Sequence, residues 1–234
     1  GGVPSWGDVA RDMLGCAVGS CAAFALEPGA TRPARRLFWT TAILGVVAGA
    51  VPLVNTVLDY RARNTQFPVL LDPNVPRTRS FTSAFGEAVF VEPLPEGLAL
   101  LDATGSLLPP HEGLAIRVPL ERGPWPGLTL EEPFPDWRGW RAWVVELANP
   151  TDQPLQLTVR VNDHLHDNRG EDRFNAAVEL PPRSRHRFEF PIADIERAPR
   201  GRLMNLNQIE KLIVFHPGPA PGQQFYLERL SLAR

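Results

Sequence analysis

The residues best suited to chemistry are concentrated in one stretch, Val161 to Asn175, which reads VNDHLHDNRGEDRFN. The stretch directly follows a run of alternating apolar and polar residues, so we expect it to form a loop at the end of a strand. Its carboxylates, amides and guanidinium groups are planar donors and acceptors of the kind that match neighbouring sugar hydroxyls. This loop is therefore the candidate site for a hydroxyl-rich ligand.

Seven residues are predicted to bind that ligand. Arg173 is the most informative of them, because its guanidinium can bind two adjacent hydroxyls or the carboxylate of an acidic sugar. We expect Asp163 and Asp172 to orient this guanidinium, and Trp125 to offer an aromatic face to the apolar side of a sugar ring. The predicted set is Trp125, Asp163, His166, Asn168, Asp172, Arg173 and Asn175.

Two other interpretations of the loop stay open. Its side chains can tie the loop to itself through Asp–Arg pairs and Asn hydrogen bonds to the backbone. It can also hold a metal, since His164 and His166 with Asp163 or Asp172 offer donors for zinc, and the carboxylates and carbonyls suit a structural calcium. The two histidines alternate along extended chain and face opposite ways, which disfavours zinc. No other cofactor is expected.

No catalytic motif accompanies these residues. A glycosidase needs two carboxylates about 5 to 10 Å apart across a cleft, and the acidic residues here are too numerous for their presence to indicate such a pair. The serines lack the Gly-x-Ser-x-Gly context of a nucleophile elbow, and no Gly-x-x-x-x-Gly-Lys phosphate loop occurs. We therefore expect a binding protein and not an enzyme.

The composition indicates what kind of domain positions the loop. The chain has 234 residues, a net charge of -2, 25 prolines and 19 glycines. This charge gives no electrostatic reason to expect nucleic acid as a partner, and the Pro and Gly content favours short strands joined by turns. The two cysteines, Cys16 and Cys21, lie in one apolar stretch and are expected to be small hydrophobic residues without a disulfide.

The first part of the chain is apolar enough for a membrane. Leu37 to Leu58 contains no charged residue, and at a rise of about 1.5 Å per residue it is about long enough to cross a hydrocarbon layer of about 30 Å. Met13 to Leu26 is a shorter candidate, in which Gly15 and Gly19 would allow close helix packing. Residues 1–63 are therefore predicted to form one or two transmembrane helices, with spans near 9–26 and 37–58.

Basic residues indicate the orientation of these helices. Arg32, Arg35 and Arg36 lie between the two spans, whereas Arg61 and Arg63 follow the second. The positive-inside rule then favours a cytoplasmic connector. The rest of the chain would be periplasmic or extracellular, attached to a bacterial cytoplasmic (inner) membrane.

From residue 65 to residue 234 the periodicity changes to two. In Leu114–Leu120 and Leu155–Val161 every second residue is apolar, which predicts half-buried strands. Similar runs at 141–147, 186–192, 211–217 and 225–233 are separated by turn-forming residues. Residues 65–234 are therefore predicted to form a β-sandwich or jelly roll, in a protein that is mainly β. Four aromatic residues are expected to pack in or near its core: Trp137, Trp140, Trp143 and Phe174.

The β region resembles a known family of modules. It carries an entry segment DWRGW at 136–140, a strand that closes on Asn149 and Pro150, and a last strand FYLERLSL at 225–232. These features resemble galactose-binding-like jelly-roll modules of the carbohydrate-binding kind, in particular family 11. The resemblance implies non-catalytic binding of a glycan. The segment 73–108 departs most from the family pattern.

The beginning of the chain resembles a second family. Val3 to Gly19, VPSWGDVARDMLGCAVG, is similar to the closing segment of the VanZ-like membrane family. Asp12 stands where that family has Asn, Gly2 stands where it has Arg, and its earlier helices are absent from this sequence. The resemblance covers only this short segment.

The predicted function is that of a membrane-anchored, non-catalytic glycan-binding protein at the outer face of a bacterial cytoplasmic membrane. Two alternatives stay open. The β region can be a structural or assembly module that binds a protein partner, or the chain can be the tail of a VanZ-like protein that affects the response to glycopeptide antibiotics.

Overall fold

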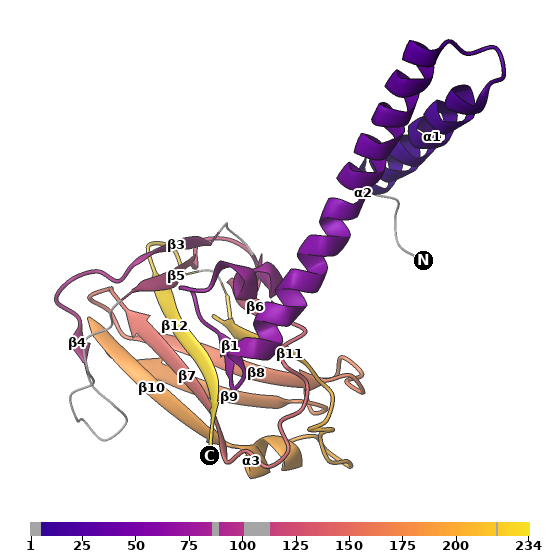
Figure 1. Cartoon of the computed structure of the whole chain (residues 1–234). Helices are drawn as coiled ribbons and strands as arrows, with labels where there is room; N and C mark the ends of the chain where they lie inside the picture. The colour runs from indigo at the N-terminus through magenta and orange to yellow at the C-terminus, as the bar shows by residue number, and fades with distance from the viewer. Residues whose placement is uncertain (1–5, 86–88, 101–112, 219) are drawn as a thin grey trace. The chain divides into compact units, whose positions relative to one another are not determined.

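The structure, a computed structural model, describes residues 6–85, 89–100, 113–218 and 220–234. It divides the chain into two compact units, Gly1–Tyr60 and Arg61–Arg234 (Figure 1). Each unit has its own internal packing and is described separately. The segment 101–112, which belongs to the region where the family resemblance is weakest, lies outside the described residues.

The first unit is built from two packed helices, α1 (Trp6–Leu26) and α2 (Arg32–Gln66), of which the second continues into the other unit. The helices approach each other closely at Gly45 of α2, where an added Cβ would lie 2.3 Å from Cγ2 of Val18. At Gly15 and Gly19 of α1, an added Cβ would have no described atom of another element within 4 Å. The glycine at this contact is therefore supplied by α2, and close helix packing at Gly15 and Gly19 stays a prediction.

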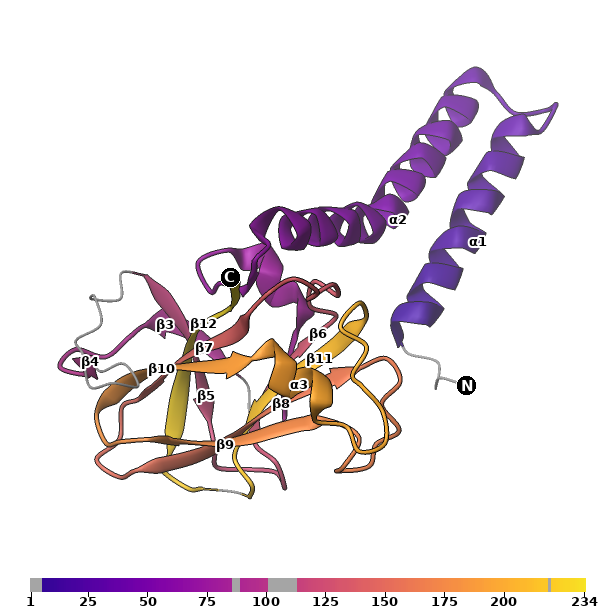
Figure 2. The same cartoon turned by 90° about the horizontal axis from the view of Figure 1, so that it is seen from below.

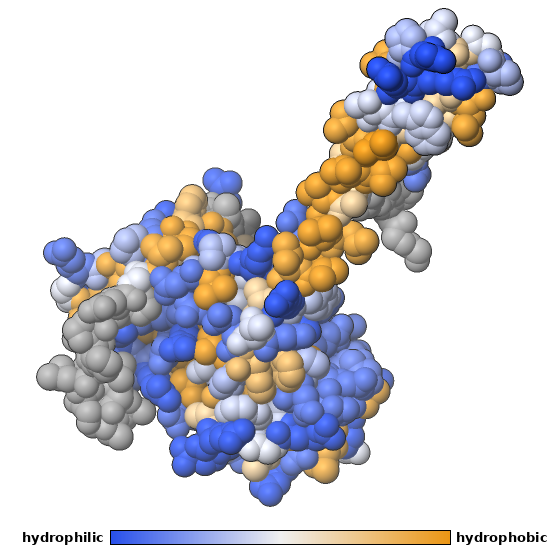
Figure 3. Space-filling model, viewed as in Figure 1, coloured by the Kyte–Doolittle hydropathy of each residue, from blue (hydrophilic) through white to orange (hydrophobic). Residues whose placement is uncertain are grey.

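Helix α2 is long and apolar enough to cross a membrane by length and composition, while α1 contains a shorter apolar run, Asp12–Leu26. Only 6% of the most apolar window of α2 is buried within the structure, unlike the core helix of a soluble domain. Apolar side chains cover much of the visible face of α2 (Figure 3). A helix that is apolar and exposed in this way needs lipid or another protein around it.

The second unit is a sandwich of two sheets (Figure 1; Figure 2). Its short helices are η1 (Pro76–Phe81) and α3 (Ile192–Arg197). The strands are β1 (Val69–Leu71), β2 (Thr82–Phe85), β3 (Phe90–Pro93), β4 (Ala99–Leu100), β5 (Leu114–Pro119), β6 (Gly127–Glu131), β7 (Ala142–Asn149), β8 (Leu155–Asp163), β9 (Phe174–Leu180), β10 (Ser184–Pro191), β11 (Ile209–Phe215) and β12 (Gln224–Ala233).

The strand order is β3-β5-β12-β7-β10-β4 in one sheet, with β1 also paired to β12, and β2-β6-β11-β8-β9 in the other. All described pairs are antiparallel except β4 with β10. The expectation of a mainly β sandwich is confirmed. Sequence-distant strands lie side by side in both sheets, so residues far apart in the chain share one face.

The core lies between the sheets and follows the predicted alternation. The apolar side chains of β8 at positions 155, 157, 159 and 161 are buried, while Gln156 between them is exposed. Trp137 and Trp143 are fully buried with their ring centroids 6.1 Å apart, and Phe174 is 8% exposed. Trp140 packs against the same cluster from a partly buried position. The expectation for these four aromatic residues is confirmed.

The outer faces of the two sheets differ. On the larger sheet, Ala115, Ala148 and Tyr226 are buried under Leu94 and Leu98, so both sides of its central strands are covered. On the five-stranded sheet, the outward residues of β9 are exposed. That second face is therefore the one on which a ligand can approach the sheet.

We expect residues 61–234 to fold without the first unit of the chain. Every residue of the main core cluster lies between Phe67 and Leu232, so the apolar contacts are complete within this part of the chain. The piece should show one cooperative thermal transition in buffer without detergent, followed by near-ultraviolet circular dichroism of Trp137 and Trp143. A gradual, non-cooperative change would mean that the boundary is misplaced.

Candidate functional site

The polar loop after β8 is organised by a residue from outside it. Arg202 donates from Nη1 and Nη2 to Asp163 at 2.6 and 2.8 Å, and from Nε to Asp172 at 2.5 Å. The backbone N–H of Asn205 also donates to Asp163, at 2.6 Å. Asp163 is fully buried. The expectation that these two carboxylates orient Arg173 is wrong, because both bind Arg202.

This arrangement keeps both carboxylates ionised. Hydrogen bonds from Arg202 lower the pKa of Asp172 to about 2. Burial acts to raise the pKa of Asp163, but the hydrogen bonds from Arg202 and the Asn205 N–H outweigh it and leave this pKa below its ordinary value. The same bonds to Asp163 and Asp172 raise the pKa of Arg202. The three side chains form a charged scaffold that fixes the base of the loop.

The rest of the loop is tied to this scaffold. Nδ1 of His166 lies 2.9 Å from the carbonyl oxygen of Asp172, and the N–H of Asp167 donates to the Asp172 carboxylate at 2.9 Å. One ligand atom each from His166, Asp167 and Asp172 lies within 4.8 Å of the others, as a cation site requires. However, both oxygens of Asp172 already accept hydrogen bonds. A structural calcium stays a prediction.

A separate pocket lies on the outer face of the five-stranded sheet. Its volume is about 280 Å³, and it is lined by Trp125, Arg160, Arg173, Ile213 and Phe215. The strand register explains the grouping, since Arg160 of β8 pairs with Ile213 of β11 on one side and with Asn175 of β9 on the other. Four segments of the chain thus meet in one hollow.

The aromatic side of the pocket depends on a glycine. A Cβ added to Gly127 would lie 2.3 Å from the carbonyl oxygen of Val214 and 2.6 Å from Cβ of Phe215, so only glycine lets β6 approach β11 this closely. Two residues earlier, Trp125 stands edge-on to Phe215 with ring centroids 5.8 Å apart. Trp125 is 55% exposed and presents much of its ring to solvent.

The cationic side of the pocket has two guanidinium groups. Arg160 lies over the ring of Phe215, 4.6 Å from its centroid, and its Nε donates to Oδ1 of Asn175 at 2.9 Å. Burial, together with the nearby charge of Arg173, lowers the pKa of Arg160 to about 10. Burial also lowers the pKa of Arg173. The Nε of Arg173 is buried and has no hydrogen-bond partner among the described residues.

The structure therefore separates the seven predicted ligand residues into two groups. Trp125 and Arg173 line the sheet-face pocket, and Asn175 adjoins it through its bond to Arg160. The other four are Asp163, the last residue of β8, and three residues of the loop that Arg202 organises: His166, Asn168 and Asp172.

Sequence reasoning missed Arg160, Ile213, Phe215 and Arg202 as functional residues. Two signals for the pocket were present, because the alternation of β8 already directs Arg160 away from the core, and β11 has apolar residues at successive positions. No local pattern marks Arg202.

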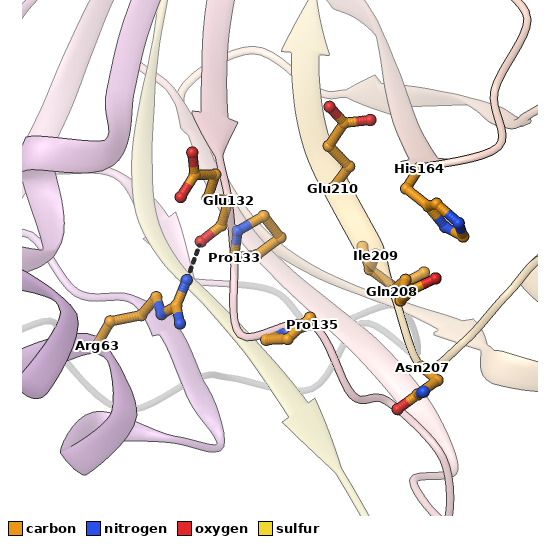
Figure 4. Close-up of a pocket in the computed structure, with 9 residues that line it drawn as sticks. All are labelled: Arg63, Glu132, Pro133, Pro135, His164, Asn207, Gln208, Ile209 and Glu210. Atoms are coloured by element: carbon orange, nitrogen blue, oxygen red, sulfur yellow. Dashed lines mark hydrogen bonds between the residues drawn. The ribbon is translucent and has the colours of Figure 1, made fainter.

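A second hollow, of about 430 Å³, lies where β6 ends and β11 begins (Figure 4). At its edge, Nη1 of Arg63 donates to the carbonyl oxygen of Glu132 at 2.9 Å. The residues that line it, all in the described part of the chain, include no Trp, Tyr or Phe: Arg63, Glu132, Pro133, Pro135, His164, Asn207, Gln208, Ile209 and Glu210. It lacks the flat apolar ring that the sheet-face pocket offers to a sugar.

Comparison with known proteins gives distant likenesses to solved structures. A family 11 carbohydrate-binding module from Clostridium thermocellum, in complex with a β-1,3-1,4-mixed-linked tetrasaccharide, is 13% identical, with 65% of this chain and 88% of the module covered and a TM-score of 0.43. An exo-β-agarase is 12% identical, with 70% of this chain but 25% of the agarase covered and a TM-score of 0.49.

No family model and no curated protein matches the chain. Other family 11 carbohydrate-binding modules are among the solved structures that are similar to this chain, at equally low identity. The resemblance of residues 3–19 to the VanZ-like family rests on the sequence motif alone.

Proposed function

We propose that this protein is a membrane-anchored, non-catalytic glycan-binding protein whose β unit lies at the outer face of a bacterial cytoplasmic membrane. One observation carries the proposal: the exposed ring of Trp125 shares a pocket with two guanidinium groups. A sugar ring has an apolar face that packs on an aromatic side chain and hydroxyls that accept from planar donors. The sequence resemblance of the β region to carbohydrate-binding modules implies the same activity.

The chemistry of the pocket supports binding without hydrolysis. None of its five described lining residues is an aspartate or a glutamate, so the pocket lacks the two carboxylates that glycoside hydrolysis requires. Its polar groups are cations that position a ligand. A surface of this kind holds a glycan and leaves its bonds intact.

We expect replacement of Trp125 with alanine to weaken glycan binding by at least about tenfold, the loss of about 1.4 kcal/mol that truncation of an interface aromatic readily causes. The full chain should be assayed on a glycan array and then by calorimetry in lipid nanodiscs, which avoid detergents with sugar headgroups. Leu203→Ala, at a side chain that is 62% exposed and lines none of the described pockets, is the matched control and should leave affinity unchanged. If no glycan binds, or if Trp125→Ala binds as well as the parent, the proposal fails and a protein partner becomes the better hypothesis.

The proposed orientation gives a second expected result. The connector with its three arginines should be cytoplasmic and the β unit external. In a Cys16→Ser, Cys21→Ser background, a cysteine at exposed Gln153 should react with an impermeant maleimide in intact spheroplasts. A cysteine at exposed Gly29, in the connector, should react only after lysis. The reverse pattern would place the β unit in the cytoplasm.

A further inference from the structure

The two arginines of the sheet-face pocket carry charge that no acidic residue balances in the part of the chain that the structure describes. Neither Arg160 nor Arg173 makes an ion pair with a described carboxylate. The pKa values of both guanidinium groups are shifted by burial, and that of Arg160 also by the charge of Arg173, but neither is shifted by a described acidic residue. Instead the two guanidinium groups lie close enough for the charge of one to affect the other. Two like charges that are both partly removed from water repel each other and lose hydration.

Two acids of the neighbouring segments are already bound to other cations. Asp172, next to Arg173 in the sequence, binds Arg202. Glu131, on the outer face of the same sheet, pairs with Lys211 at 3.0 Å. Neither of these two acids therefore neutralises the pocket. An anion from outside the protein would do so.

The pocket also restricts the shape of that anion. Its volume of about 280 Å³ lies just below the range of about 300 to 1,000 Å³ that is typical of small-molecule sites, so it suits one ring with its substituents. Trp125 and Phe215 provide an apolar wall on one side of the two guanidinium groups. An inorganic anion would leave that wall unused, whereas a sugar ring that carries an oxyanion would use both.

We infer that the glycan bound at this pocket is acidic, with the oxyanion of a uronate or a sulfated sugar held by Arg160 and Arg173 while its ring packs on Trp125. The inference rests on the proposed function and names its ligand class. The guanidinium is suited to this role because it binds carboxylate and sulfate oxygens through two parallel hydrogen bonds. Arg173 lines the pocket, and no described group accepts a hydrogen bond from its buried Nε, so the described protein does not fully satisfy this guanidinium.

The test compares acidic and neutral forms of one glycan on the full chain in nanodiscs of zwitterionic lipid. The probes are a uronic acid oligosaccharide with its methyl ester, and a sulfated oligosaccharide with its unsulfated form. At least one acidic probe should bind about tenfold or more tightly than its neutral counterpart, and the difference should shrink as salt screens the charges. The pair that shows the difference identifies the oxyanion.

Variants assign the effect to the pocket. Arg160→Gln and Arg173→Gln should each reduce affinity for the acidic probe by about tenfold and change affinity for the neutral probe by less than about threefold. Arg169→Gln is the matched control, because this arginine lies in the same loop, pairs with Asp167 and has a side chain that is 75% exposed. If Arg173→Gln does not fold, Arg173→Lys tests the same point, since it keeps the charge but loses the paired hydrogen bonds and should retain only part of the preference.

The possible failures are distinguishable. If acidic and neutral probes bind equally and Trp125→Ala abolishes both, the inference is overturned but glycan binding stands. If no glycan binds and vesicles of anionic phospholipid bind instead, both the inference and the proposed function fail. In that case the arginines recognise a lipid phosphate.

Discussion

Replacing Arg202 with methionine is expected to lower the free energy of unfolding of the β unit by about 3 kcal/mol, the lower end of the about 3 to 5 kcal/mol that follows from removing one partner of a buried ion pair. Methionine keeps most of the side-chain volume but leaves Asp163 fully buried without its cation. Arg202 itself is 24% exposed, so solvent screening places the effect at the lower end of the range.

Urea denaturation of residues 61–234, followed by tryptophan fluorescence, measures this loss. Arg169→Met is the matched control, because Arg169 also contacts an aspartate of the same loop but is 75% exposed. It should change the free energy of unfolding by no more than about 0.5 kcal/mol. If the two variants unfold at the same urea concentration, Arg202 does not hold the loop.

The pH dependence of the same effect has a definite sign. A carboxylate whose pKa is lower in the folded state contributes stability that is complete above its unfolded pKa of about 3.9 and is lost as the pH falls toward the folded pKa. The folded pKa of Asp172 is about 2, and that of Asp163 is also lowered. The difference in stability between the parent and Arg202→Met should therefore be largest at neutral pH and should shrink below about pH 4. A difference that grows on acidification would contradict the assigned charges.

The role of Arg202 illustrates which parts of this structure the sequence can predict. The strands and the core follow from alternation within one segment, as in β8, where four apolar side chains at every second position are all buried. Asp163 and Arg202, in contrast, are separated by 39 residues and meet only because β11 pairs with β8. No periodicity in the sequence encodes that contact. Without Arg202 in view, the carboxylates of the loop have no evident partner, and the sequence alone therefore predicts a ligand site there.

The sheet-face pocket was only partly predictable for a similar reason. The chemistry of their side chains predicts Trp125 and Arg173 as ligand residues, and both line the pocket. Arg160 and Phe215 complete it through strand register, and register depends on how the whole sheet assembles. In the helical unit, the glycine at the close contact with Val18 is Gly45, and small residues occur in both helices, so only their packing distinguishes them.

A second large effect on the free energy of unfolding is expected in the larger sheet, at the ion pair between Arg185 on β10 and Glu228 on β12. Nε of Arg185 donates to Oε1 of Glu228 at 2.8 Å, and Nη2 donates to Oε2 at 2.5 Å. The two side chains are 10% and 1% exposed, so the pair is more deeply buried than the one at Arg202. The two strands lie on opposite sides of β7, and the pair therefore links three strands.

Arg185→Met should lower the free energy of unfolding by about 3 to 5 kcal/mol, because it leaves the carboxylate of Glu228 buried without its guanidinium partner. The double variant Arg185→Met, Glu228→Met removes both charges and keeps the volume, so it should recover most of that loss and unfold within about 1 kcal/mol of the parent. Urea denaturation of residues 61–234 measures the parent, the single variants Arg185→Met and Glu228→Met, and the double variant. The double variant can instead lose as much free energy of unfolding as the two single variants lose together. The two side chains would then stabilise the sheet through contacts other than the compensation of each other's charge. Recovery in the double variant would instead show that the cost of the single change arises from the stranded carboxylate.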